Sequence, residues 1–164
     1  MESPHMAAND YEFLTTWRVP GTCEQVYDVL VEGIDYPRWW PQVYLDVVET
    51  DAGGPYGLGK SGTLHTRGWL PYTLRWESRV IEVRHPAGFT IEARGDFVGR
   101  GVWQFRQKGN EVEIQFDWRI RAEKPLLRRL SFLLKPVFTA NHRWAMACGE
   151  EALKAELARR TSES

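Results

Sequence analysis

The sequence is poor in the residues that cross-link small domains or bind metals. Its two cysteines, Cys23 and Cys148, lie far apart and outside any Cys-x-x-Cys motif, so neither a disulfide framework nor a zinc site is predicted. No run of 18 apolar residues occurs, which excludes a membrane-spanning helix. The 21 basic and 22 acidic residues leave a net charge of −1. Because a nucleic-acid-binding protein needs a basic surplus to neutralise phosphates, this balance argues against that class.

The N-terminal segment also lacks an apolar stretch. Its first ten residues, MESPHMAAND, have no hydrophobic region of the kind found in secretory signals. We therefore expect a cytoplasmic protein. We expect residues 1–9 to be a disordered head, part of it a cloning remnant that ends at His5-Met6. The remaining length suits one domain, predicted over residues 10–160.

Aromatic residues, in contrast, are abundant. Eight Trp, six Tyr and seven Phe make up 13% of the chain. Aromatic side chains contribute the most apolar area per residue, and those of Trp and Tyr also carry a polar tip. With 43% hydrophobic residues the chain can bury a substantial core, so it is not predicted to be disordered.

Strand and helix signals follow one another in a definite order. Residues 11–19 predict a first strand, which Pro20-Gly21 ends. Thr22 then begins a short helix with Gln25 three residues later, the spacing of a capping box, and residues 34–42 predict a second short helical turn. Six further strands, separated by Gly- and Pro-containing turns, are predicted over 43–50, 61–69, 72–84, 88–97, 100–107 and 111–121. One of these turns is placed at residues 99–101.

The last part of the chain has a helical period. Apolar residues recur at three- and four-residue spacing from Leu130 through Val137 to Ala152, which predicts a helix over 124–160 that Pro136 kinks. In the preceding strand one dry face is predicted, formed by Val112, Ile114, Phe116, Trp118 and Ile120. Only the long helix has a stripe large enough to cover such a sheet. We therefore predict an α+β fold: a seven-stranded antiparallel sheet curled around a long C-terminal helix, with two short helices after the first strand.

Several short motifs accompany this element order. They are Trp39-Trp40-Pro41, Trp76-Glu77, GDFVGRGVW at 95–103, NHRWAM at 141–146 and Gly149-Glu150-Glu151. Over residues 10–160 the sequence resembles the START-like superfamily, also called SRPBCC or helix-grip, and within it the polyketide cyclase/dehydrase and lipid-transport branch. The resemblance implies a single ligand-binding domain with an elongated apolar cavity between sheet and helix, used for lipids, polyketides, sterols or similar ligands. Some relatives are aromatase/cyclases, and many are carriers.

Residues on the predicted dry faces are the candidates for such a cavity. The expected ligand-binding residues are Trp39, Tyr72, Leu74, Trp76, Ile91, Phe97, Trp103, Phe116, Trp118, Phe138, Asn141, His142 and Ala145. Ordinary core packing is the alternative for the aromatic ones, and of the adjacent Trp39 and Trp40 only one is expected to face inward. Asn141 could bond either a ligand oxygen or a buried backbone group. No catalytic residue, metal ligand or cofactor is assigned.

Three functions fit these residues. The leading hypothesis is a binding protein for an apolar or aromatic small molecule that resembles a lipid or polyketide. The main rival is a cyclase or dehydratase in which His142, Asp117 or a tyrosine moves protons. The third is lipid exchange at a membrane surface, because four cations alternate with leucines at the start of the long helix. These are Lys124, Arg128, Arg129 and Lys135. A solvated outer helix face is the simpler explanation of this pattern, and the oligomeric state is left open.

Two further patterns carry less weight. Residues 57–62 (GLGKSG) spell Gly-x-Gly-x-x-Gly, but a strand rather than a helix is predicted to follow. A dinucleotide site needs that helix for the pyrophosphate, so a Gly-rich hairpin loop is favoured. His65 and Arg67 share one strand face, which is expected to be the outer one.

Overall fold

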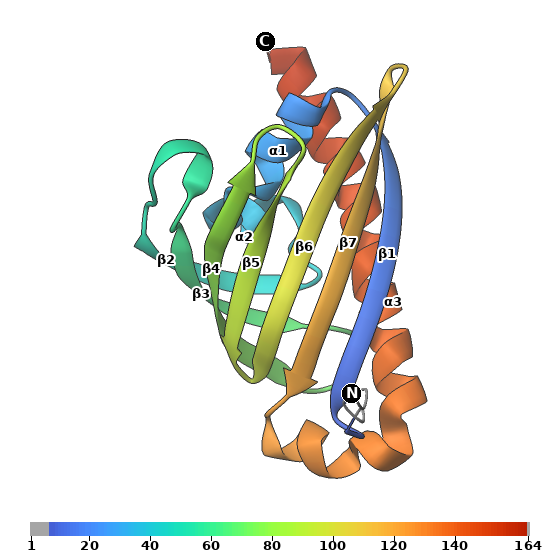
Figure 1. Cartoon of the computed structure of the whole chain (residues 1–164). Helices are drawn as coiled ribbons and strands as arrows, with labels where there is room; N and C mark the ends of the chain where they lie inside the picture. Colours follow the sequence, from blue (N-terminus) through green and yellow to red (C-terminus); the bar gives the residue numbers. More distant parts are fainter. Residues whose placement is uncertain (1–6, 164) are drawn as a thin grey trace, which may run out of the picture.

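A curled antiparallel sheet and one long helix form most of the molecule (Figure 1). The computed structural model describes residues 7–163. Its strands are β1 (Asp10–Pro20), β2 (Tyr44–Asp51), β3 (Ser61–Arg67), β4 (Thr73–Arg84), β5 (Gly88–Gly95), β6 (Phe97–Lys108) and β7 (Glu111–Ala122). The helices are α1 (Cys23–Leu30), α2 (Tyr36–Trp39) and α3 (Pro125–Glu163), with 3-10 turns η1 (Gly33–Asp35) and η2 (Pro55–Gly57). The predicted α+β helix-grip fold is confirmed.

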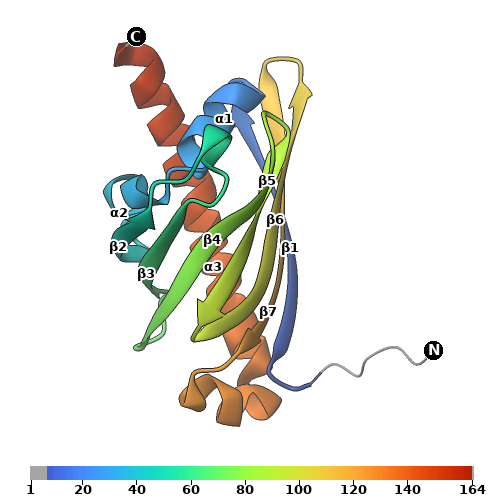
Figure 2. The same ribbon diagram turned by 60° about the vertical axis from the view of Figure 1, so that its left-hand side comes forward.

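The strands form a single sheet in the order β1-β7-β6-β5-β4-β3-β2. From β2 to β7 the neighbours follow one another in sequence, and β1 pairs antiparallel with β7 over its whole length. Figure 2 shows the sheet curving so that α3 runs along its inner face, with α1 beside the C-terminal part of α3. Residues 7–9 form a turn before β1. The expectation of a disordered head falls mostly on residues 1–6, which lie outside the described residues.

Local signals account for the start of α1. The Thr22 hydroxyl accepts a hydrogen bond from the Gln25 backbone N–H, and the Gln25 side chain accepts one from the Thr22 N–H. This is the predicted capping box, which satisfies two backbone donors at the helix start.

Alternation along β7 gives the sheet its dry inner face. Val112, Ile114, Phe116, Trp118 and Ile120 are all buried, as predicted. The residues between them are less buried and carry most of the polar groups of the strand. Each large apolar side chain removed from water contributes about 1.5–3 kcal/mol to folding, so this face accounts for much of the stability.

The turn between β5 and β6 lies at Gly95-Asp96, and the predicted turn at residues 99–101 is wrong. Gly99 and Gly101 lie inside β6 because neighbouring groups leave no room for a side chain there. A Cβ on Gly101 would lie 2.7 Å from the Phe116 ring and 2.8 Å from the Trp118 ring. Atoms of these two rings therefore lie against the backbone of β6.

Helix α3 changes direction near its start. In Figure 1 its first turns run across the end of the sheet, and the rest runs along the sheet. Pro136 lies inside the helix and accounts for the bend, since proline removes a backbone hydrogen bond and clashes with the preceding turn. The predicted stripe is partly wrong, because Val137 is exposed. After the bend Asn141 is buried, as the predicted stripe requires, but the other buried positions are Met146, Gly149, Leu153, Glu156 and Leu157, which the stripe did not include.

A buried carboxylate fastens α2 to the C-terminal part of α3. Glu156 is 3% exposed and accepts two hydrogen bonds from Arg38, at 3.0 and 2.7 Å. Arg159 and Arg160 also donate to it, at 2.8–3.0 Å. Hydrogen bonds from Arg159 and from the other two arginines outweigh burial and hold the pKa of Glu156 well below its usual value of 4.5.

Replacing this carboxylate should destabilise the fold. Glu156→Gln removes the buried carboxylate that three arginines share and leaves Arg159 and Arg160 only their outer partners, Glu163 and Asp35, so we expect a loss of about 2 kcal/mol in the free energy of unfolding. Because the folded-state pKa is lowered, the stabilisation is present at neutral pH and is lost as the pH falls below 4.5. Urea denaturation at neutral pH measures the effect. Glu151→Gln, at an exposed ion pair on the same helix, should change it by less than about 0.5 kcal/mol, and equal effects would contradict the account.

Candidate ligand-binding cavity

A cavity of about 180 Å³ lies between the sheet and α3. All seven strands contribute to its lining, and so do α3 and the segment that contains α2. Apolar cavities of about 150 Å³ can hold a benzene-sized molecule, so this one has room for a small ring system.

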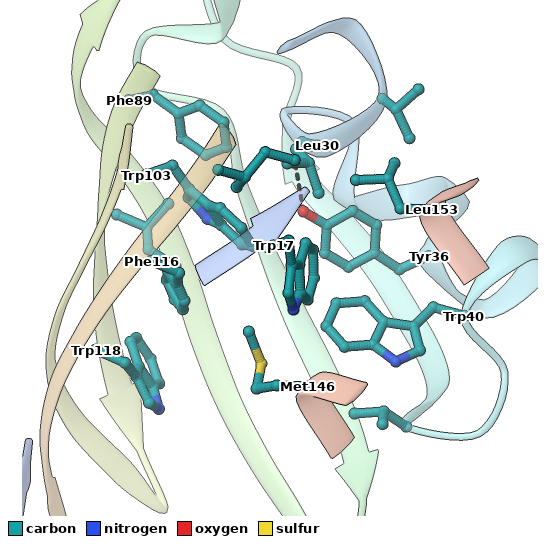
Figure 3. Close-up of a cluster of buried hydrophobic side chains, with 14 of the residues drawn as sticks. Trp17, Leu30, Tyr36, Trp40, Phe89, Trp103, Phe116, Trp118, Met146 and Leu153 are labelled. Carbon is teal, nitrogen blue, oxygen red and sulfur yellow. Dashed lines mark hydrogen bonds between the residues drawn. The ribbon is translucent and has the colours of Figure 1, made fainter. Parts of the chain in front are cut away.

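Stacked aromatic rings form one wall of the cavity. Trp103 on β6 stacks on Phe116 of β7 with ring centres 4.1 Å apart, and Phe116 stacks on Trp118 at 5.4 Å. Trp76 of β4 extends the row, 5.6 Å from Trp118. We call these four residues the aromatic wall. Figure 3 shows Trp103, Phe116 and Trp118 in one column on the sheet side.

The opposite wall comes from α3 and from the segment after α2. Met146 and Trp40 lie across from the aromatic wall in Figure 3. Trp40 can approach α3 closely because residue 149 is a glycine, where a Cβ would lie 2.4 Å from the indole. Trp39 is also buried, but it does not line the cavity. Its ring stacks on that of Trp40 with centres 5.6 Å apart, so of the two neighbours it is Trp40, and not the expected Trp39, that lines the cavity.

Most polar groups of the lining bond to the protein itself. The Trp76 indole N–H donates to the Thr66 hydroxyl at 3.2 Å. The Tyr36 hydroxyl donates to the Leu30 carbonyl (Figure 3). The Trp40 indole N–H is buried and has no hydrogen-bond partner among residues 7–163. The lining is therefore mainly apolar, with few groups left to orient a ligand.

His142 is the most unusual polar residue of the lining. Its ring stacks on Phe13 with centres 4.0 Å apart, and its buried Nε2 has no hydrogen-bond partner within the described part of the chain. Burial, and after it the charge of Arg143, lowers the pKa of His142 from 6.5 to about 4. The imidazole is therefore neutral near pH 7.

Asn141 of α3 bonds the backbone of the β3–β4 loop. Its side-chain oxygen accepts hydrogen bonds from the backbone N–H groups of Trp69 and Leu70, at 2.8 and 3.3 Å. A Cβ on Gly68 would collide with the same side chain, so Gly68 lets the loop come this close. Of the two roles considered for Asn141, a bond to backbone groups is the one observed, here to partly buried N–H groups, and it holds the β3–β4 loop against α3.

Tyrosines supply the other titratable groups inside the cavity. Burial raises the pKa of Tyr72 to about 12 and that of Tyr44 further. Both hydroxyls are therefore protonated at neutral pH and can act only as neutral donors or acceptors. Tyr72 packs edge-on against Phe138 of α3, with ring centres 6.2 Å apart.

Charged side chains of the lining lie where the cavity approaches the surface. Lys60 forms ion pairs with Glu49 at 3.1 Å and Glu32 at 3.3 Å. Arg67 is exposed at the end of β3. Asp117, one of the proton carriers considered for an enzyme, lies outside the cavity and pairs with Arg119 at 3.1 Å. His65 also lies outside the lining, whereas Arg67, expected on the same outer face, is one of the lining residues.

Apart from Trp39, the predicted ligand-binding residues line the cavity. They are Tyr72, Leu74, Trp76, Ile91, Phe97, Trp103, Phe116, Trp118, Phe138, Asn141, His142 and Ala145. The prediction missed Tyr11 and Phe13 on β1, although their two-residue spacing places them on one face. It also missed Leu64 and Thr66 on β3, which alternate in the same way.

Other chemistries find little support in the residues described. Between residues 7 and 163, no cluster of His, Cys, Asp or Glu is arranged to hold a metal ion. Both cysteines are free. No helix in that range is long and apolar enough to cross a bilayer. The Gly-x-Gly-x-x-Gly segment joins η2 to β3, so a strand follows it, as predicted.

Known structures share this fold. TTHA0849 from Thermus thermophilus superposes with a TM-score of 0.71 at 15% identity, covering 89% of this chain and 99% of that one. The Zhui aromatase/cyclase from Streptomyces sp. R1128 gives 0.69 at 16% identity, covering 93% and 96%. A START superfamily protein from Mycobacterium smegmatis gives 0.66 at 12% identity, covering 90% and 97%. No curated protein matches the sequence.

The sequence itself carries a family signature. The family model described as polyketide cyclase/dehydrase and lipid transport matches residues 19–146, from the end of β1 to the middle of α3. That range includes most strands of the sheet and much of the cavity lining. The chain therefore belongs to the polyketide cyclase/dehydrase and lipid-transport family.

Proposed function

We propose that this protein binds an uncharged aromatic or lipid-like small molecule in the cavity between the sheet and α3. The observation that carries the proposal is a cavity whose sheet side is a row of stacked aromatic rings. Burial of apolar ligand surface, at about 25 cal/mol per Å², would drive binding. The flat rings favour a planar ligand, since stacked aromatic pairs gain about 0.5–1.5 kcal/mol beyond burial.

The polar groups support an uncharged ligand. The cations of the lining, Lys60 and Arg67, lie at its edges, and Lys60 is paired with two carboxylates. Deeper groups are neutral, since burial lowers the pKa of His142 and raises that of Tyr44. A charged ligand head would lose its hydration there without a counter-charge to replace it.

The experiment uses 2-naphthol, a planar uncharged probe, with isothermal titration calorimetry. Trp103→Ala should weaken binding at least about fivefold, because it removes a ring of the aromatic wall. His142→Ala should weaken it less than about twofold. Phe105→Ala, at a buried residue of the same strand outside the lining, is the matched control and should leave affinity unchanged. No saturable binding to the unmodified protein would refute the proposal, and equal losses for Trp103→Ala and His142→Ala would favour an enzyme or a polar-headed ligand.

Catalysis is the second candidate, and His142 is the observation that favours it. An imidazole nitrogen without a protein partner, inside a cavity, is placed to accept a proton from a bound molecule, but a pKa of about 4 makes it a weak base at neutral pH. One of the similar structures is named an aromatase/cyclase. The lining around His142, however, holds no carboxylate that could orient it, since Glu49 lies with Lys60.

The titration of His142 separates these two functions. Because its folded-state pKa of about 4 lies below the ordinary 6.5, protonation favours the unfolded chain. Between about pH 7 and about pH 5 the protein should lose about 2 kcal/mol more stability than the His142→Phe variant, which keeps the stack on Phe13. Denaturation at the two pH values and the NMR titration of the ring both measure this. A pKa near 6.5 would contradict the buried, neutral imidazole and favour a proton-transfer role.

A further inference from the structure

We infer that the first three turns of α3 form a docking surface for an anionic lipid bilayer, at which the cavity takes up or releases its ligand. The inference rests on the proposed function and adds a partner to it. We call residues Leu126, Arg128, Arg129, Phe132, Leu133 and Val137 the α3 docking face.

The apolar members of this face are strongly exposed. Phe132 is 74% exposed, Leu133 65% and Leu126 46%. At about 100° per residue, Leu126, Phe132 and Leu133 fall on the side of the helix opposite the buried Leu127 and Ser131, and Val137 lies at the flank of that side. A helix of a globular protein normally presents polar residues to water, whereas this segment presents large apolar side chains to water. Figures 1 and 2 show these turns projecting beyond the end of the sheet.

The charged residues in this part of α3 are all basic. Between Glu123 and Glu150 the sequence contains no Asp or Glu. Lys124 lies 3.9 Å from Asp96, and Lys135 donates to the Asp10 carbonyl, so these two cations already have partners. The side chains of Arg128 and Arg129 are exposed and form no ion pair with any residue of 7–163. Cations near a helix N-terminus oppose the helix dipole, which makes an external anionic partner the natural reason for them.

Charge also favours a bilayer over a second copy of the chain. A twofold contact would bring the same patch of both copies together and would set arginine against arginine. An anionic bilayer instead offers phosphates to Arg128 and Arg129 and an apolar interior to Phe132 and Leu133.

The docking face lies next to the cavity. Leu127 lines the cavity, while its neighbour Leu126 is exposed. The β3–β4 loop, which Asn141 holds against α3, adds Trp69, whose side chain is 50% exposed. Tryptophan favours the headgroup layer of bilayers, so this loop provides a second contact beside the lining residue Tyr72.

The test is co-sedimentation of the full chain with vesicles of phosphatidylcholine, with and without phosphatidylglycerol. Binding should require the anionic lipid and weaken as salt is added, since salt screens the arginines. Arg128→Gln with Arg129→Gln should lower the partition coefficient about tenfold or more. Phe132→Ser with Leu133→Ser should do the same through loss of apolar insertion. Matched controls on the outer face of the sheet, Leu14→Ser and Arg100→Gln with Arg106→Gln, should leave it unchanged.

Several outcomes would overturn the inference. They are no binding to anionic vesicles, binding that salt and the docking-face variants do not change, and a dimer that those variants dissociate. The 2-naphthol titration on the same variants keeps this failure separate from failure of the proposed function. All these changes lie outside the cavity lining, so probe affinity should stay constant even when vesicle binding is lost.

Discussion

The stacking of Trp103, Phe116 and Trp118 along the inner face of the sheet is the interaction on which the rest of the structure depends. The rings of Phe116 and Trp118 can approach the β6 backbone because Gly101 has no side chain there. The cavity lies between this row of rings and α3.

On the side opposite the aromatic wall, Trp40 and α2 pack against α3. Gly149 lets Trp40 pack directly on α3, and the ion pair of the buried Glu156 with the half-exposed Arg38 fastens α2 to the same helix. At the other end, the bend at Pro136 turns the first part of α3 across the end of the sheet. That bend has two consequences, since it places Leu127 over the cavity and leaves Phe132 in water.

The order of elements could be predicted from the sequence because strand alternation and turn residues are local signals. The dry face of β7 and the capping box at Thr22 are examples, and both were found as predicted. The turn after β5 was misplaced because Gly99 and Gly101 look like turn residues. Glycine is needed at these two positions because the neighbouring strand comes too close for a side chain. Local patterns do not contain such contacts between distant segments.

The same limit applies to the cavity. Alternation was enough to place Trp76 and Trp118 on the inner face. The choice between Trp39 and Trp40 depends on Gly149, more than a hundred positions away, and could not be made locally. The partners of Asn141 lie in the β3–β4 loop, and the burial that keeps His142 neutral comes from the folded chain around it. The hydrogen bonds of Asn141 and the lowered pKa of His142 therefore depend on the folded cavity and could not be predicted from local patterns.

Native mass spectrometry of the protein purified from its own host tests the central claim most directly, because it asks what the cavity holds without choosing a probe. We expect a species heavier than the bare chain, which releases an uncharged, apolar or aromatic molecule on activation and is depleted in the Trp103→Ala variant. A protein that carries only a charged metabolite, or that stays bare and also fails to bind any planar apolar compound added to it, would contradict the account.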